Sequence, residues 1–240
     1  MILDFGTEKI PCKVEKARGR RTNISFRNDQ SVLIIRTPGG KFTPQVQEFV
    51  FKNEAWILKN FKKQKGKLSQ RDEFLKKLDR GIVPYLGETY QIEFLLDSKR
   101  WVQREEEEKK IYIYMLKKDS PEMRMSLLYG ALRSLAKSHL ERRTIELARA
   151  IDSEINHIRT KDLKSKWGSC SSKRNINLNW HLILLPPPIV DYVIIHELMH
   201  LREMNHSKQF WNWVAHYYPN YKLAEKSLKQ NQWMIGVMEQ

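Results

Sequence analysis

The sequence predicts an α+β fold, because strand-like and helix-like patterns fall in different parts of the chain. Short runs rich in β-branched and aromatic residues, which favour strands, recur in the first half. These runs are VLIIRTP (32–38), TYQIEFLL (89–96) and KKIYIYML (109–116). From Ser120 to about Ile151, apolar residues recur instead at helical spacing. We therefore place the main boundary near residue 119, between a β-rich N-terminal region with one helix (1–119) and a C-terminal domain (120–240).

The N-terminal region holds one predicted helix. Thr43 and Pro44 are typical of a helix start, with Thr as the N-cap and Pro at the first helical position. Apolar residues then recur at helical spacing as far as Phe61. The basic stretch QKGKLSQ (64–70) is predicted to be a loop, and the acidic run Glu105–Glu108 is predicted to be a solvated turn between two strands.

After its first helix, the C-terminal domain is expected to hold two strands and then three further helices. The predicted strands are EINHIRT (154–160) and RNINLNWHLILL (174–185). In the second strand Asn alternates with apolar residues, which is typical of a half-buried strand with one polar face. The prolines at 186–188 end this strand. The further helices are expected over 189–204, from Ser207, and over about 221–235.

Composition restricts the class of protein, since 41% of the 240 residues are hydrophobic, which is enough for a packed core. Lys and Arg number 43 against 28 Asp and Glu, giving a formal net charge of +15. A solvated basic surface explains this charge most simply, and a nucleic acid or nucleotide partner is the alternative. The two cysteines, Cys12 and Cys170, form no disulfide framework, and no apolar run has the length of a signal peptide or membrane span. We therefore expect a cytoplasmic protein with no membrane partner.

The segment HELMH (196–200) carries the clearest chemical signal in the chain. On a helix, residues four positions apart lie on the same face, so His196 and His200 can bind one metal ion. Glu197 would point beside the ion, where it can act on a water molecule. A buried histidine pair with a carboxylate costs free energy unless it is compensated, and a Zn²⁺ ion would compensate it.

A third ligand is expected, because a catalytic zinc ion commonly has three protein ligands and one open position. His206 is the best choice, since Asn205 can adopt the left-handed conformation that turns the chain where the helix ends. Ser207 would then cap the next helix and fix the turn. Glu203 and Glu225 remain rival third ligands.

The segment 166–211 resembles the YgjP-like zinc-dependent metallopeptidase domain, which is related to the SprT-like and WLM zinc proteases. The motifs that carry the resemblance are WGSCS (167–171), INLN (176–179), the HELMH helix and NHSKQFW (205–211). The resemblance implies a zincin-like fold for the C-terminal domain and an intracellular location. It also implies peptide or protein substrates and Zn²⁺ as the cofactor, bound by His196, His200 and His206.

The resemblance also suggests roles for residues around the motif. In zincins the edge of a strand binds an extended peptide, and two interpretations of Asn177 and Asn179 stay open: they line that edge, or they are exposed polar residues of a sheet face. Glu197 is expected to accept a proton from zinc-bound water as general base. No residue stands out as the stabiliser of the oxyanion, and the candidates are Arg174, Arg202 and Tyr217.

The leading hypothesis is therefore zinc-dependent hydrolysis of peptide bonds. One alternative keeps the zinc ion and hydrolyses nucleotide phosphoanhydrides, although the sequence has no P-loop. A second alternative is a nucleic-acid-associated basic protein with a zinc centre. Loss of peptide cleavage in Glu197→Gln would favour the first hypothesis, and salt-dependent DNA binding that survives metal removal would favour the last.

Overall fold

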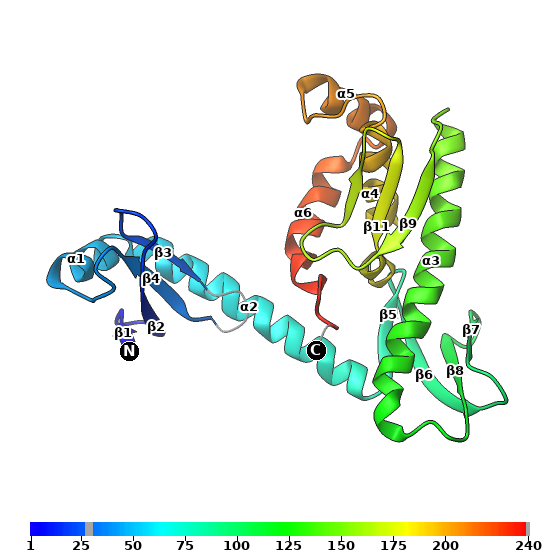
Figure 1. Cartoon of the computed structure of the whole chain (residues 1–240), viewed down its shortest axis with the longest axis horizontal. Coiled ribbons are helices and arrows are strands. Elements are labelled where there is room, and N and C mark those ends of the chain that lie inside the picture. The colour runs from blue at the N-terminus through cyan, green and yellow to red at the C-terminus, as the bar shows by residue number, and fades with distance from the viewer. Residues whose placement is uncertain (27–30, 239–240) are drawn as a thin grey trace. The chain divides into compact units, whose positions relative to one another are not determined.

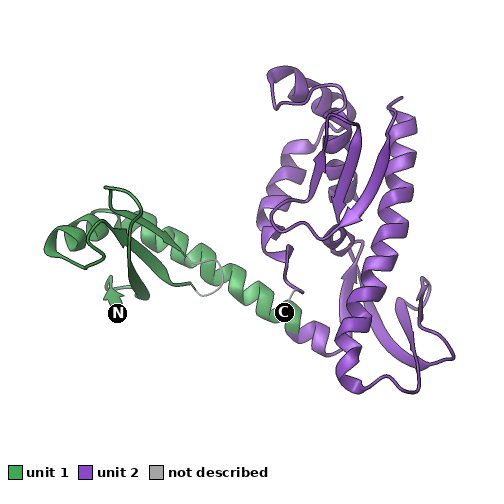
Figure 2. Ribbon diagram, viewed as in Figure 1, with its two compact units in different colours: residues 1–75 green, residues 76–240 purple. Residues whose placement is uncertain are grey.

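The chain forms a mixed α+β structure whose internal contacts divide it into two compact units, Met1–Leu75 and Lys76–Gln240 (Figures 1 and 2). The computed structural model describes residues 1–26 and 31–238. The predicted α+β class is confirmed, with a β-rich N-terminal region and several helices in the C-terminal part. The domain boundary predicted near residue 119 falls inside the second unit and stays a prediction.

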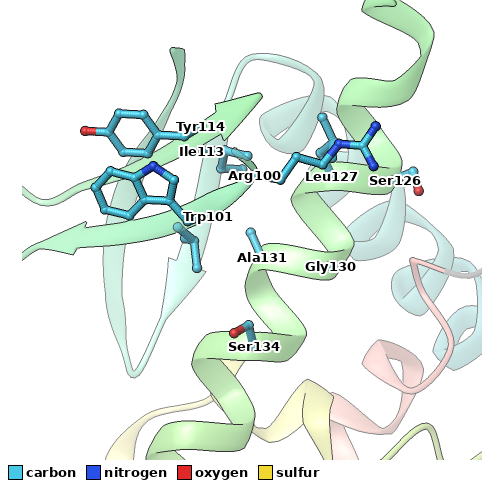
Figure 3. Close-up of a pocket in the computed structure, with 10 residues that line it drawn as sticks. Arg100, Trp101, Ile113, Tyr114, Ser126, Leu127, Gly130, Ala131 and Ser134 are labelled. Carbon is cyan, nitrogen blue, oxygen red and sulfur yellow. The ribbon is translucent and has the colours of Figure 1, made fainter. Parts of the chain in front are cut away.

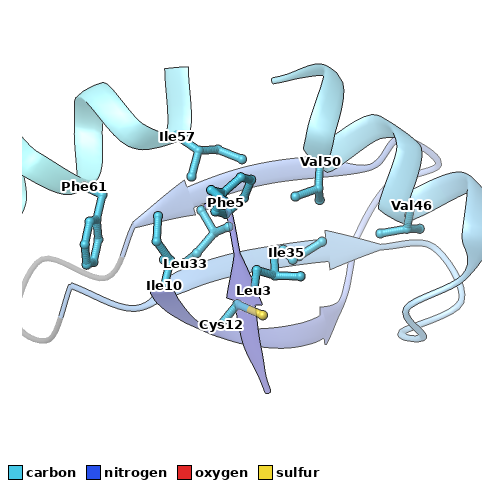
Figure 4. Packing of buried hydrophobic residues seen from close by; sticks show 10 residues of the cluster. All are labelled: Leu3, Phe5, Ile10, Cys12, Leu33, Ile35, Val46, Val50, Ile57 and Phe61. Atoms are coloured by element: carbon cyan, nitrogen blue, oxygen red, sulfur yellow. The ribbon is translucent and has the colours of Figure 1, made fainter. Parts of the chain in front are cut away.

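The first unit is built on a four-stranded sheet in the order β1-β2-β4-β3. Its strands are β1 (Ile2–Asp4), β2 (Lys9–Lys16), β3 (Asn23–Phe26) and β4 (Leu33–Thr37). Strands β2 and β4 run parallel, and the other two pairs are antiparallel. Side chains of this sheet meet apolar residues of α1 (Pro44–Lys52) and of the first part of α2 (Glu54–Asp79) in one buried cluster (Figure 4).

Helix α1 begins where the sequence predicts, but the single helix predicted as far as Phe61 is wrong, because α1 ends at Lys52 and α2 begins at Glu54. The hydroxyl of Thr43 accepts a hydrogen bond from the backbone N–H of Val46, and Pro44 occupies the first helical position. The loop predicted over 64–70 is wrong, because α2 runs through it without a break. Lys and Gln are good helix formers, and a single exposed glycine, Gly66, costs an exposed helix only about 1 kcal/mol. The buried residues of α2 recur at helical spacing before, at the start of and after this segment: Ile57, Phe61, Gln64, Phe74 and Leu78.

The second unit contains two sheets. The four-stranded sheet has the order β5-β6-β8-β7, with β5 (Ile82–Tyr85), β6 (Glu88–Leu96), β7 (Trp101–Glu105) and β8 (Lys110–Met115). The three-stranded sheet has the order β10-β11-β9, with β9 (His157–Lys161), β10 (Gly168–Cys170) and β11 (Asn175–Asn179). The strands predicted near 89–96 and 109–116 are confirmed as β6 and β8. β5 was not predicted because Pro84 is typical of a turn, but an edge strand tolerates proline.

Helices surround the two sheets of the second unit. They are η1 (Pro121–Met123), α3 (Arg124–Ala150), η2 (Trp180–Leu184), α4 (Pro187–Met199), α5 (Lys208–Tyr217), α6 (Tyr221–Asn231) and η3 (Gln232–Met234). α3 contacts strands of both sheets as well as η2 and α4. Among residues 1–26 and 31–238, none of the helices has the length and apolar composition that crossing a membrane requires.

Two predicted boundaries in this unit are wrong. The strand predicted over 174–185 ends at Asn179, because the Asn179 side chain accepts a hydrogen bond from the backbone N–H of His181 and starts a 3-10 helix there. The helix predicted over 189–204 ends at Met199, and the chain turns before Ser207. That turn decides where the third histidine lies.

Candidate metal centre

Helix α4 carries polar residues where its surroundings are apolar. It contacts α3, α5, α6, β10 and β11, so most of its residues are buried. A helix enclosed in this way is expected to be apolar all round. Asp191, His196 and Glu197 on the helix and His200 at its C-cap are exceptions, and burying such groups costs free energy unless something compensates them.

The three predicted histidines converge on one point. His196, His200 and His206 each offer a ring nitrogen, and these nitrogens all lie within 4.8 Å of one another. The Nε2 atoms of His196 and His206 are 3.1 Å apart. Nitrogens bound to one tetrahedral zinc ion at ~2.0–2.1 Å would be separated by about 3.3 Å. The donor set therefore fits a single metal ion.

A tight turn after α4 brings His206 to the other two histidines. The backbone N–H groups of Leu201 and Arg202 bond to carbonyls three residues earlier, which tightens the end of the helix. Ser207 then caps α5, because its hydroxyl accepts from the backbone N–H of Phe210 at 3.2 Å. The predicted cap is confirmed. Asn205 does not take the left-handed conformation that was expected of it.

A backbone carbonyl orients His200. The Nδ1 atom of His200 lies 3.1 Å from the carbonyl oxygen of Glu203, which leaves Nε2 as the free nitrogen when Nδ1–H donates. Glu203 thus supports the site through its backbone. Glu225 instead pairs with Lys229 at 2.8 Å. The histidine cluster in the described residues includes neither of these rival ligands.

Aromatic residues of α5 pack against the three imidazoles. The ring centroid of Phe210 lies 4.9 Å from that of His196, 4.5 Å from His200 and 4.8 Å from His206. Trp211 adds ring contacts to His196 and His206. Phe210 has no exposed surface, so it closes the inner side of the cluster. Both residues belong to the NHSKQFW motif, but the sequence alone does not show that their rings pack on the histidines.

Burial shifts the pKa values of His196, His200 and Glu197 in the direction that favours their uncharged forms. Burial, helped by the neighbouring histidines, lowers the pKa of His196 to about 3, and burial also lowers the pKa of His200. Burial raises the pKa of Glu197 to about 8, and the charge of Lys166 opposes that rise. Neutral imidazoles keep the lone pairs that a metal ion needs.

A family comparison agrees with this geometry. The model of the YgjP-like metallopeptidase domain matches residues 20–231 of the chain. The chain belongs to the YgjP-like metallopeptidase family. The resemblance predicted from the WGSCS, HELMH and NHSKQFW motifs is therefore confirmed, and the chain is a peptidase whose family requires a metal ion and acts on peptides or proteins.

Solved structures and curated proteins add little to this assignment. The zymogen of the metallopeptidase abylysin from Pyrococcus abyssi is 24% identical, and the match covers 39% of this chain and 95% of that one at a TM-score of 0.36. The zymogen of jannalysin from Methanocaldococcus jannaschii is 23% identical, with 38% and 94% covered at a TM-score of 0.33. No curated protein matches the chain.

Other predicted site residues of this YgjP-like metallopeptidase have different roles. Strand β11 is paired on both sides, so the interpretation that Asn177 and Asn179 line a free strand edge is wrong. Asn177 donates to the Ser169 hydroxyl at 3.2 Å. The free edge on that side of the sheet belongs to β10, which contacts α4.

The candidate oxyanion stabilisers bond elsewhere in the structure. The guanidinium of Arg174 donates to the carbonyl of Glu154, and that of Arg202 donates to the carbonyl of Ile151. Arg202 also lies over the rings of Trp213 and Tyr217. These contacts join neighbouring chain segments, so both guanidinium groups already have hydrogen-bond partners outside the histidine site.

The YgjP-like metallopeptidase has a separate cavity of about 490 Å³ between the four-stranded sheet and α3 (Figure 3). Trp101 and Tyr114 stack in parallel beside it, with ring centroids 3.9 Å apart. Its lining comes from β7, β8, α3 and Arg100. None of the lining residues belongs to α4 or α5, so the cavity is not part of the histidine site.

Proposed function

We propose that this protein is a zinc-dependent peptidase in which His196, His200 and His206 hold the zinc ion and Glu197 is the general base. The observation that carries the proposal is the approach of three imidazole nitrogens to within 4.8 Å of one another, on and beside a helix that also presents Glu197. Nitrogen donors from three histidines are a common ligand set of catalytic zinc.

In this proposal the three histidines hold the metal ion and Glu197 transfers a proton. When bound, zinc would polarise the scissile carbonyl and make a water molecule acidic enough to ionise near neutral pH. The carboxylate of Glu197 accepts that proton and returns it to the leaving amine nitrogen. The Glu203 carbonyl lies 3.1 Å from Nδ1 of His200, and a hydrogen bond donated by Nδ1–H would leave Nε2 free for the metal. Phe210 excludes water from the inner side of the imidazoles.

A fluorogenic peptide library tests this proposal with wild type and Glu197→Gln. Glutamine keeps the size of the side chain and cannot accept the proton, so kcat is expected to fall by about 10²–10⁴-fold while bound zinc is unchanged. EDTA should abolish wild-type hydrolysis, and added zinc should restore it. Equal hydrolysis by wild type and Glu197→Gln would contradict the assigned role of Glu197.

The same samples test the alternatives based on charge. The net charge of +15 supports a nucleotide or nucleic acid partner but does not distinguish it from a solvated surface. In one outcome, wild type hydrolyses nucleoside triphosphates but cleaves no peptide, and Glu197→Gln hydrolyses neither. That outcome would indicate that the substrates are phosphoanhydrides and not peptides. We keep the peptidase as the proposal because the family supports it.

A further inference from the structure

The side chain of Glu197 lies directly against the backbone of Gly168. A Cβ atom added at Gly168 would lie 2.6 Å from Oε1, 2.7 Å from Cγ and 2.9 Å from Cδ of Glu197. Carbon atoms in ordinary contact are ~3.5–4.0 Å apart. Much of the glutamate side chain, not only its tip, therefore occupies the space that a side chain at position 168 would need.

Gly168 is needed for space and not for backbone conformation. Its φ lies outside the left-handed region, in contrast to Gly81 and Gly87 in the same unit. It sits in strand β10, where its partner in the antiparallel register is Leu178. Any L-residue can adopt such an extended backbone. The contact with Glu197 is what excludes a side chain at this position.

The backbone of Gly168 is held in place from two directions. On the β11 side, Asn179 donates through its side chain to the carbonyls of Leu163 and Lys166, at 2.7 and 2.9 Å. The backbone N–H of Asn179 also donates to the Trp167 carbonyl at 2.8 Å. From the C-terminal segment, Gln232 accepts a hydrogen bond from the Trp167 indole at 3.1 Å. β10 cannot easily move away from Glu197 to make room.

Glu197 is equally restricted on its own helix. The residue is only 6% exposed, and its neighbour Leu198 is fully buried. A free glutamate side chain samples several rotamers about its sp³ torsions. Here the wall formed by Gly168 removes part of that freedom.

We propose that Gly168 is a positioning residue for Glu197, with the bare backbone of β10 forming a wall that fixes the carboxylate beside the metal centre. The proposal rests on the proposed role of Glu197 as general base. A side chain at position 168 displaces the carboxylate and leaves the three histidines in place. It also explains chemically why a glycine follows the buried Trp167 in the WGSCS motif.

A double-mutant cycle on thermal stability tests the contact without any enzyme assay. Gly168→Ala, Glu197→Ala and the double variant are measured as full-length proteins, as purified and after EDTA treatment. Gly168→Ala is expected to lower Tm by at least about 3 °C when Glu197 is present. In the Glu197→Ala background the shift should disappear, because alanine lacks Cγ, Cδ and the carboxylate. Equal shifts in both backgrounds would overturn the proposal.

Gly130→Ala on α3 is the matched control for this cycle. A Cβ at Gly130 meets no atom within 4 Å, so its effect on Tm should be the same with and without the Glu197 side chain. Should Gly168→Ala fail to fold alone, the double variant with Glu197→Ala is expected to fold. Failure of both to fold would count against the proposal.

Kinetics then separate positioning from general damage to the fold. With a peptide substrate, Gly168→Ala is expected to lower kcat about 100-fold, since a displacement of about 1 Å costs that much. KM should stay within about twofold of wild type, and zinc content should not change. A coupled Tm shift in a protein that cleaves no peptide would support the contact and reject the peptidase function. An unchanged kcat in an active enzyme would reject the positioning role.

Discussion

Helices α2 and α4 differ in where they place their charged side chains: α2 exposes them to solvent, and α4 buries Glu197. α2 is long and basic, and the lysines that it exposes to solvent are Lys59, Lys62, Lys63, Lys65, Lys76 and Lys77. α4 is short and mostly buried, and it carries Glu197 among apolar neighbours. The side chains of these lysines reach solvent, so their number says little about function. On α4 each polar group needs a specific partner, so a few such groups indicate a site.

Removing apolar volume from α4 should give the largest loss of stability. Leu198 has no exposed surface, so Leu198→Ala is expected to lower the free energy of unfolding by about 2–5 kcal/mol. Leu223→Ala is the matched control, because Leu223 is 69% exposed and its loss should cost no more than about 0.5 kcal/mol. Urea denaturation of both variants measures the difference. Similar losses at the two positions would contradict the burial described for α4.

The polar contact that ties α4 to α3 should have a smaller effect. Asp191 on α4 accepts two hydrogen bonds of 2.8 Å from the guanidinium of Arg143. Both side chains are partly exposed, so solvent screening limits the expected loss in Asp191→Ala to about 1 kcal/mol. Lys62→Ala on α2 provides the comparison and should change stability by less than about 0.5 kcal/mol. Adding salt should reduce the effect of Asp191→Ala.

Replacing a glycine in α2 should give the smallest change in stability, and this change should be stabilising. A Cβ at Gly66 meets no atom within 4 Å, and the residue lies inside a continuous helix. Gly66→Ala is therefore expected to raise the free energy of unfolding by about 0.5–1 kcal/mol. Gly81→Ala should instead destabilise, since Gly81 has a φ of +72°. A destabilising Gly66→Ala would favour a loop over 64–70 in place of the helix.

Local sequence signals predicted the parts of the structure that depend on neighbours along the chain. Thr43 and Ser207 were recognised as helix caps, and both bond as expected. The spacing of His196 and His200 on one helix turn, followed by a third histidine after a turn, predicted which side chains would meet. The loop predicted for the basic stretch at 64–70 is wrong, because its lysines and glycine are as compatible with an exposed helix as with a loop.

Periodicity and residue spacing do not predict contacts between segments that lie far apart in the sequence. The pairing of β11 on both sides depends on β9 and β10, which lie on either side of it in space, so the interpretation of Asn177 as a residue of a free strand edge is wrong. The approach of Gly168 to Glu197 requires β10 to pack on α4, which no local pattern reveals. The WGSCS motif is visible in the sequence, but only the fold explains why position 168 in that motif is a glycine.

The metal content of three proteins tests the proposed centre most directly: wild type, His206→Ala and His216→Ala. His216 lies on the same helix as Phe210 but outside the histidine cluster, so it controls for the loss of an imidazole. Elemental analysis after zinc reconstitution is expected to find about one zinc ion per chain in wild type and His216→Ala, and much less in His206→Ala. Wild type without zinc, or His206→Ala with as much zinc as wild type, would contradict the three-histidine centre.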